Sequence, residues 1–163
     1  MKIDIKKAFD SVPHCVIHRK LRELHVQDNM IKYIMNFVQL RYSALNGQNS
    51  CGIAQGDPLS MWLFCISIND VLKELDREDI KFIAYADDLV IQLENPKDAG
   101  DMVDHCASLF EKIGLRLNLD KCESTADQNE ISFMGIQFGE HTRNLPISVR
   151  LRESCKEAVK EYE

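Results

Sequence analysis

This sequence lacks any long apolar run, and its first residues show no signal-peptide pattern. A helix that crosses a membrane needs roughly 18 or more consecutive apolar residues, and a secretory leader needs a basic start followed by an apolar stretch. We therefore expect no membrane association. We expect the protein to stay inside the cell, in the nucleus or the cytoplasm.

The cysteines lack any paired CxxC spacing, although the chain holds six of them. This scattered pattern argues against a disulfide framework and against a zinc site. Cys15, Cys65 and Cys106 fall within apolar helical patterns. We therefore expect reduced thiols buried in the core.

An excess of positive charge is also missing, because the formal net charge is −6. Generic polyanion binders are basic, so this chain is not expected to grip nucleic acid by charge alone. The charge is compatible with an active site in which metal ions bridge carboxylates to a nucleic acid. Any basic grip on such a partner would then lie outside this chain.

The length and composition suit one globular domain, since the 163 residues are 45% hydrophobic and 28% charged without an internal repeat. Strand-like and helix-like stretches alternate, which favours an α+β fold. The expected strands are 2–5, 42–45, 82–85, 89–93, 115–119 and a bent hairpin over 131–138. The expected helices run from Ser11 and Pro13 to about Leu24, from Asp28 past Val38, from Pro58 to about Arg77, from Asn95 to Gly114, and over 148–163.

The most informative stretch covers residues 81–93, where two apolar strands flank Asp87 and Asp88. We expect both aspartates at the turn of a tight hairpin, because aspartate tolerates turn geometry. Adjacent carboxylates repel each other and resist desolvation unless a cation neutralises them. Hard divalent ions such as Mg²⁺ prefer carboxylate oxygens. A solvated polar turn is the alternative interpretation of the dipeptide taken by itself.

Residues 51–60 form a second informative stretch, with Gly52 and Gly56 before a helix that starts at Asp57 and Pro58. Aspartate is a good N-cap, and proline is suited to the first helical position. A glycine loop that leads into a helix N-terminus can also bind an anion. Most such loops are only helix starts, so this signal is weak when taken alone.

Five stretches in order resemble the palm of a reverse transcriptase, most closely that of non-LTR retrotransposons. They are DIKKAFDSVPH at 4–14, CGIAQGDPLS at 51–60, YADD at 85–88, GLRLNLDKCE at 114–123 and FMGIQFG at 133–139. The resemblance covers nearly the whole chain. It implies a polymerase palm with a ferredoxin-like core, in which helices pack on one face of an antiparallel sheet.

The resemblance also implies an RNA-directed DNA polymerase, in which a primer 3′-hydroxyl attacks the α-phosphorus of a dNTP. This chemistry uses two Mg²⁺ ions, with Mn²⁺ as a substitute, held about 3.5–4 Å apart. By analogy, Asp4 and Asp87 would be the main ligands, with Asp88 beside them and the backbone carbonyl of Ile5 completing the set. Asp10 is better explained as a capping or surface carboxylate.

Further roles follow from the same resemblance. Phe9 has the position of a gate against the ribose 2′-hydroxyl, Gln55 and Gly56 would line the nucleotide, and Lys121 would assist the departing pyrophosphate. A core aromatic and a solvated lysine are the alternatives for Phe9 and Lys121. The primer-grip residues would be Phe133, Met134 and Gly135.

Two departures from the family pattern fall on the expected nucleotide and template wall. Ala54 replaces the usual arginine before the glutamine, and Met61 replaces the usual proline after PLS. Neither change removes an expected metal ligand. Activity or processivity could nevertheless be reduced.

Residues 1–147 are expected to form the palm, and 148–163 a helical tail that begins a thumb or connection. The fingers and thumb of such an enzyme do not fit in this length, so we expect a fragment of a retrotransposon protein that acts with those segments, an RNA template and a DNA primer. A truncated or domesticated module that binds without polymerising is the main alternative. A nucleotidyl cyclase on a similar palm is a third reading, against which the loop at 51–60 and the hairpin at 133–139 count.

Overall fold

Helices and short antiparallel strands share the chain, as the alternation in the sequence predicts. The computed structural model describes residues 1–46, 50–125, 130–134 and 136–139. No helix among these residues is both long and apolar enough to cross a lipid bilayer. In chain order the elements are β1 (Lys2–Ile3), α1 (Ala8–Ser11), α2 (His14–Glu23), α3 (Asp28–Asn46), α4 (Pro58–Arg77), β2 (Phe82–Tyr85), β3 (Asp88–Ile91), η1 (Pro96–Asp98), α5 (Ala99–Lys112), η2 (Leu119–Lys121), β4 (Glu130–Phe133) and β5 (Ile136–Gly139).

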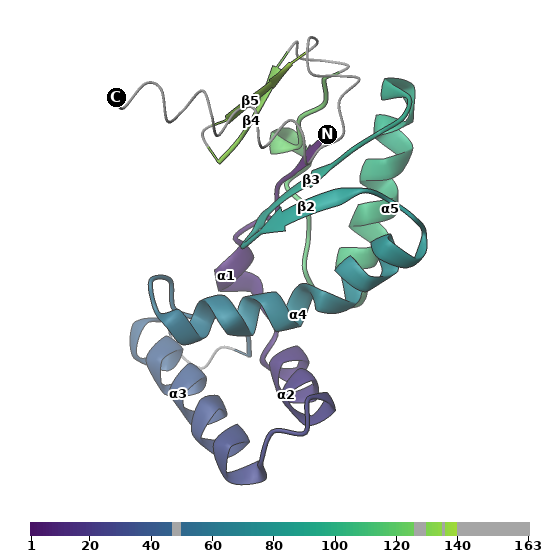
Figure 1. Ribbon diagram of the computed structural model, residues 1–163. Coiled ribbons are helices and arrows are strands. Elements are labelled where there is room, and N and C mark those ends of the chain that lie inside the picture. The colour runs from purple at the N-terminus through teal and green to yellow at the C-terminus, as the bar shows by residue number, and fades with distance from the viewer. Residues whose placement is uncertain (47–49, 126–129, 135, 140–163) are drawn as a thin grey trace, which may run out of the picture.

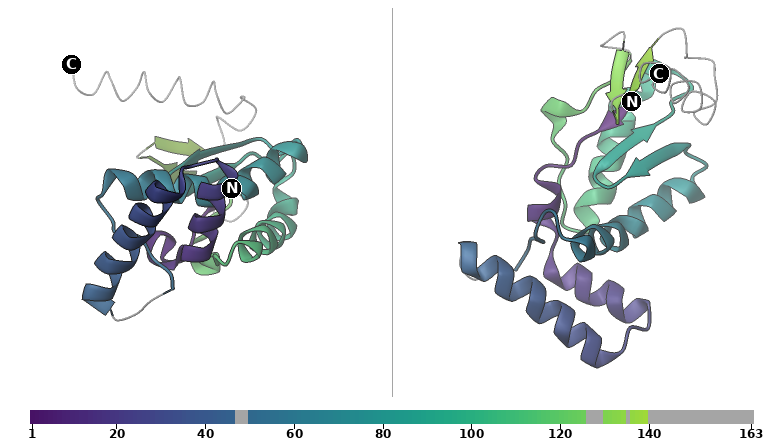
Figure 2. Two further views of the ribbon diagram at one scale, coloured as in Figure 1. Left: turned by 90° about the horizontal axis from the view of Figure 1, so that it is seen from below. Right: turned by 60° about the vertical axis from the view of Figure 1, so that its left-hand side comes forward.

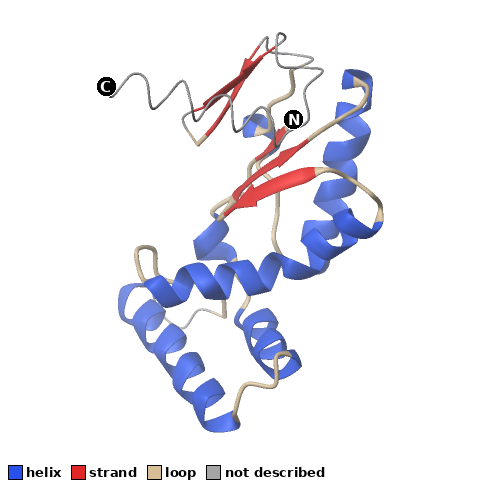
Figure 3. Cartoon of the chain, in the orientation of Figure 1, coloured by secondary structure: helices blue, strands red, loops and turns tan. Residues whose placement is uncertain are grey.

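The central sheet has β3 in the middle, with β1 and β2 antiparallel on its two sides (Figure 1, Figure 3). Because side chains alternate along a strand, Ile3, Leu89 and Ile91 share one face. They are buried in the main core together with Phe64 of α4 and Phe110 of α5. Helices therefore cover this face, as expected from the sequence.

The opposite face of the sheet is covered over part of its area by the hairpin of β4 and β5. Val90 is buried there against Ile131, Phe133 and Phe138, with Ile83 packed at the edge of the cluster. This small second core does not extend to the end of the sheet where β2 turns into β3, and polar side chains lie there. The hairpin over residues 130–139 agrees with the expected one, although Gly135 lies outside the described residues.

α2 packs against both α3 and α4 to form a helical layer beside the sheet (Figure 2). The nearly buried Lys20 of α2 donates hydrogen bonds to Asp70 of α4 and to Glu23. Burial alone would lower the pKa of Lys20, but these hydrogen bonds and the two negative charges outweigh it and raise the pKa. The ammonium is therefore a fixed charge that ties α2 to α4.

Two of the expected strands are wrong. Residues 42–45 continue α3 to Asn46, because extending a helix that has already formed adds a hydrogen bond for each residue fixed. Residues 115–119 form no ladder; they make the single bridge between Ile5 and Leu117 and then enter η2. The strand expected at 2–5 is correspondingly short, and the expected tail helix at 148–163 lies outside the described residues.

The prediction for the cysteines is correct for Cys106 and wrong for Cys15 and Cys65, which are exposed. Cys65 follows the buried Phe64 on α4, and one residue turns the helix by about 100°, enough to leave the apolar stripe. Burial, with smaller contributions from Cys122 and Glu78, raises the pKa of Cys106 to about 12. Its thiol is therefore protonated at neutral pH.

A thiol reagent tests this arrangement, because the thiolate is the reactive form. At pH 8 in the native chain, we expect Cys15 and Cys65 to be modified quickly, and Cys106 only after unfolding in urea. Peptide mass mapping over time gives the rate at each site. Modification of native Cys106 as fast as Cys65 would contradict its burial and raised pKa.

Gly114 ends α5 with a φ of +78°, and a Cβ built on it would lie 2.8 Å from the Cγ of Pro13. We expect Gly114→Ala to lower the free energy of unfolding by about 1–3 kcal/mol, since both the backbone and the contact become strained. Gly100→Ala is the matched control, because Gly100 lies in α5 with no atom within 4 Å of an added Cβ. The control should raise the free energy of unfolding by about 0.5–1 kcal/mol, and urea titrations that show equal effects would refute the argument.

Candidate active site

The β2–β3 turn presents Asp87 to solvent. Tyr85 pairs with Asp88 at the last rung of the hairpin, so the turn consists of Ala86 and Asp87. The expectation that both aspartates occupy the turn is therefore wrong, because Asp88 is the first residue of β3. Ala86 takes a φ of +53°, as tight hairpins require at their first central position.

The register between β1 and β3 brings a third carboxylate to this place. Ile3 pairs with Leu89 in the antiparallel ladder. Carried one residue further, the same register sets Asp4 opposite Asp88, and directly opposed residues have Cα atoms about 4.5–5.5 Å apart. Asp4 and Asp88 then share the face of the sheet that the helices leave free, with Asp87 next in the chain.

Asp88 already has a cationic partner, because the ammonium nitrogen of Lys2 lies 3.1 Å from its carboxylate oxygen. Within the described part of the chain, no group of three or more histidine, cysteine, aspartate or glutamate side chains is arranged to hold a metal ion. The carboxylates therefore form no closed metal cage. Such a donor set suits an ion like Mg²⁺, which uses one or two carboxylates and takes further ligands from substrate phosphates and water.

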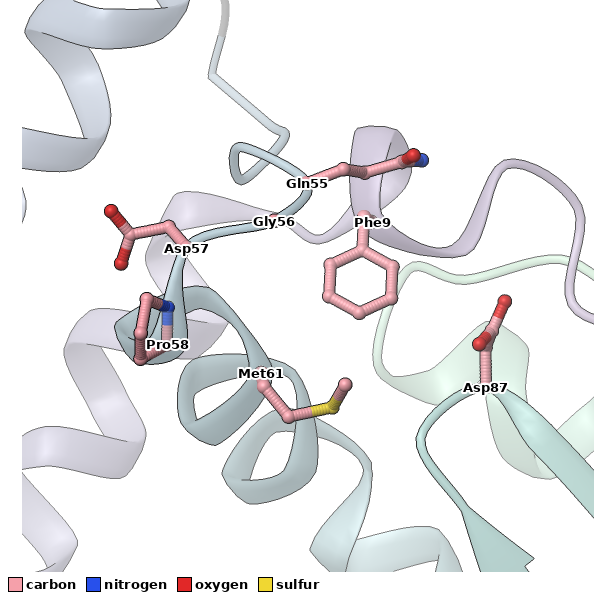
Figure 4. Close-up of a pocket in the computed structure, with 7 residues that line it drawn as sticks. All are labelled: Phe9, Gln55, Gly56, Asp57, Pro58, Met61 and Asp87. Carbon is pink, nitrogen blue, oxygen red and sulfur yellow. The ribbon is translucent and has the colours of Figure 1, made fainter.

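A cavity of about 490 Å³ lies beside the turn, a size within the range of small-molecule sites. It is lined by residues of the β2–β3 turn, of α1 and of the start of α4 together with the loop before it (Figure 4). Three nucleotide-site candidates, Phe9, Gln55 and Gly56, thus meet the metal-ligand candidate Asp87 in one place. The full lining is Phe9, Gln55, Gly56, Asp57, Pro58, Met61 and Asp87.

The ring of Phe9 is held in a fixed position at this cavity. It stacks on Phe64 of α4 with ring centroids 4.9 Å apart and planes inclined by 19°. Figure 4 shows the ring directed into the space between Gln55, Met61 and Asp87. One face of the Phe9 ring is thus packed on Phe64, as expected for a core aromatic. The same side chain also lines the cavity, as expected for a residue that contacts the nucleotide.

The loop before α4 is tied to the segment that carries Phe9. The backbone N–H of Ile53 donates to the carbonyl of Phe9 at 2.9 Å, and that of Gly52 donates to Val12 at 2.8 Å. The buried His14 donates from Nε2 to the Gly52 carbonyl at 2.8 Å. Sequence reasoning gave His14 no role, although it closes the first matching stretch.

The start of α4 agrees with the sequence prediction. The Asp57 carboxylate accepts a hydrogen bond from the Leu59 N–H at 2.9 Å, and Pro58 begins the helix. Gly56 takes a φ of +84°, although an added Cβ would meet no atom within 4 Å. Glycine is thus required there by backbone conformation and not by space.

Lys121 lies on the segment that runs along the free edge of β1. It is exposed at the end of η2, and the N–H of Asn118 in the same segment donates to the Asp4 carbonyl at 2.8 Å. Cys122 also contacts Asp4. Burial raises the pKa of the Cys122 thiol. A hydrogen bond from the Asp4 backbone lowers that pKa, and the negative charge of Asp4 raises it.

The candidate primer-grip residues differ in their surroundings. Phe133 is buried against Phe138, with centroids 6.5 Å apart, whereas Met134 is exposed with a φ of +53°. Gly135 lies outside the described residues. The hairpin that carries them covers the same face of the sheet to which the register assigns Asp4 and Asp88.

Comparisons with known proteins agree on one family. The sequence profile of the family "Reverse transcriptase (RNA-dependent DNA polymerase)" matches residues 1–138. The Pol polyprotein of the type-1 retrotransposable element R2 from Popillia japonica is 30% identical over an alignment of 142 residues, which covers 76% of this chain and 23% of that protein. The Pol polyprotein of the type-2 element R2DM from Drosophila melanogaster is 31% identical over an alignment of 136 residues, which covers 74% of this chain and 13% of that protein.

A third relative, the R2 Pol polyprotein of Nasonia vitripennis, is 31% identical over an alignment of 140 residues, which covers 76% of this chain and 14% of that protein. The chain thus spans less than a quarter of the length of these relatives. The fold and the profile together indicate a polymerase palm. The chain therefore belongs to the reverse transcriptase family, RNA-dependent DNA polymerases, and to its non-LTR retrotransposon type.

Proposed function

We propose that this chain is the palm of an RNA-directed DNA polymerase that transfers a nucleotide from a dNTP to a primer 3′-hydroxyl. The observation that carries the proposal is the cavity in which Phe9, Gln55 and Gly56 meet Asp87. In a chain of this family, that arrangement sets a nucleotide-sized space beside carboxylates. The template is RNA, as the family description implies, and the primer in this proposal is DNA.

Asp4 and Asp87 hold the two divalent ions in this proposal, Mg²⁺ or Mn²⁺ in its place, with Asp88 beside them. When bound there, such ions would supply charge that lowers the pKa of the attacking hydroxyl and stabilises the leaving pyrophosphate. The carbonyl of Ile5 has a suitable direction. The backbone groups of Asp4 and Lys6 form hydrogen bonds with the segment 116–118. Because the backbone groups of successive residues in a strand point to opposite sides, the carbonyl of Ile5 points toward β3.

Phe9 and the 51–57 loop select and position the nucleotide. Because Phe64 holds the ring of Phe9, the ring resists displacement by a ribose 2′-hydroxyl, which favours deoxyribonucleotides. Gln55 and Gly56 contact the nucleotide and the template base. Lys121 supplies a proton or a positive charge to the departing pyrophosphate from the segment beside Asp4.

The remaining assignments follow from the family. Residues 1–147 form the palm with a ferredoxin-like core, and 148–163 lead toward a thumb or connection. The hairpin with Phe133, Met134 and Gly135 supports the primer end. Fingers and thumb elsewhere in the parent protein supply the basic groups that a chain of net charge −6 does not concentrate. The protein acts inside the cell, in the nucleus or the cytoplasm, where its nucleic-acid partners are.

A binding or structural module without polymerase activity is the second candidate. Lys2 forms an ion pair with Asp88. The described residues also offer no cluster of three or more metal-binding side chains. Met61, where the family usually has proline, projects into the cavity (Figure 4). Activity of the parent protein separates the two candidates.

Asp87→Asn in the parent protein should reduce metal-dependent dNTP incorporation by at least about 100-fold, because charge stabilisation at the reacting phosphate is lost. Primer extension on an RNA template measures the effect. Asp101→Asn is the matched control, since Asp101 is an exposed residue of α5 away from the cavity. Undiminished extension by the Asp87 variant would remove Asp87 from the site and refute the assigned mechanism.

The 163-residue chain by itself should not extend a primer detectably with Mg²⁺ or Mn²⁺. Its negative net charge opposes binding of a duplex, which depends on phosphate neutralisation. A loosely held primer end also loses most of the rate gained from near-attack geometry. Template-primer extension with the purified chain is the measurement, and robust extension that Asp4→Ala abolishes would show that the palm suffices alone.

A further inference from the structure

Lys2 places a positive charge beside Asp88, one of the three carboxylates proposed above to lie at the metal site. Its ammonium lies 3.1 Å from Asp88, and the two side chains retain 23% and 40% of their exposure. The pair is thus partly withdrawn from water, where an ion pair is screened less than on an open surface. None of the roles proposed above uses this lysine.

The register explains why Lys2 reaches this position. Lys2 pairs with Val90 on β3, and the next residue of β3 on the same face is Asp88. Asp4, two residues beyond Lys2, also shares this face. On the other side of β1, Lys2 pairs through its backbone with Glu123. The Lys2 ammonium thus pairs with Asp88, on the face of the sheet to which the register also assigns Asp4.

Carried one residue further, the register sets Asp4 opposite Asp88, and Asp87 precedes Asp88 in the chain, so three negatively charged residues lie at this end of the sheet. Like charges at such distances raise the free energy of the folded state, and a nearby cation offsets that cost. Lys2 supplies such a charge from within the chain. A divalent ion approaching the same carboxylates meets a positive charge already in place.

We propose that Lys2 is an internal counter-ion of Asp4, Asp87 and Asp88. In the metal-free protein the Lys2 ammonium pairs with Asp88 and so competes with divalent cations for these carboxylates. Lys2 is a positioning residue, because it acts through Asp88. A divalent ion that bound these carboxylates would displace Lys2 from Asp88. The inference rests on the proposed function, since it takes Asp4, Asp87 and Asp88 as the metal site.

Mn²⁺ binding to the purified chain tests the inference without any enzymatic activity. The electron paramagnetic resonance signal of free Mn²⁺ gives the dissociation constant. We expect Lys2→Gln to bind Mn²⁺ about tenfold more tightly than the unmodified chain, because a competing charge is removed. Lys2→Arg keeps the charge and should stay close to the unmodified chain. The backbone bonds of Lys2 to Glu123 do not involve the side chain and persist in both variants.

Lys81→Gln is the matched control for net charge. Lys81 is exposed and precedes β2 at the end of the sheet far from the turn, as the pairing of Phe82 with Ile91 shows. It should leave Mn²⁺ affinity within about twofold of the unmodified chain, because its charge is separated from the carboxylates by more than a screening length of about 8 Å. If Lys2→Gln and Lys81→Gln tightened Mn²⁺ binding equally, the effect would come from net charge, and the inference would be overturned.

Thermal unfolding gives a second readout. In chelator, Lys2→Gln should unfold at a lower temperature than the unmodified chain, since the carboxylates lose their counter-ion. Added Mn²⁺ should raise its unfolding temperature by more than it raises that of the unmodified chain, because tighter binding to the folded state stabilises more. Lys2→Met, checked for folding by circular dichroism, replaces Lys2→Gln if the latter does not fold.

The outcomes separate the two proposals. If Asp4→Asn weakens Mn²⁺ binding but the folded Lys2 variants bind no more tightly, the counter-ion role is refuted and the metal site stands. If Asp4→Asn and Asp88→Asn both leave Mn²⁺ binding unchanged, the proposed metal site fails. Absence of measurable Mn²⁺ binding in both the unmodified chain and Lys2→Gln also overturns the inference.

Discussion

The antiparallel pairing of β1 with β3 is the constraint on which the candidate site depends. It joins the first residues of the chain to the second strand of the hairpin through the rung between Ile3 and Leu89. Both side chains are buried in the main core, and a slip of one residue would turn them toward the other face. Burial of apolar side chains on one face thus sets the register that, carried one residue further, places Asp4 opposite Asp88 on the other face.

A second set of contacts connects the nucleotide-site candidates to this frame. Hydrogen bonds from residues 52 and 53 to residues 9 and 12 hold the glycine loop against α1, and His14 adds a side-chain bond from a buried position. Phe9 in turn stacks on Phe64, which belongs to the same core as Ile3. The cavity therefore lies between two parts of the chain that share one core. Packing in that core positions both Phe9 of α1 and the turn that carries Asp87.

The sequence predicted the features set by local chemistry. The helix start at Asp57 and Pro58, the strands around YADD and the main helical stripes agree with the structure because each depends on capping, turn residues or periodicity within a short segment. Features set by partners distant in the sequence were missed. The pairing of Lys2 with Asp88 and the bond from His14 to Gly52 join segments with no common local pattern. The roles of the candidate catalytic residues come from family resemblance, and the structure adds their placement.

Ala86 shows how the frame supports a locally unfavourable conformation at the site. A non-glycine residue with a φ of +53° raises the free energy by about 1–3 kcal/mol, and it persists only where neighbouring structure determines it. Here the ladder from Phe82 to Tyr85 leaves a turn of only two residues, and the buried Leu89 fixes the returning strand. The core side of the sheet therefore stabilises the turn that exposes Asp87. Buried apolar contacts on the far face thus fix the backbone position of Asp87, although its side chain is exposed to solvent.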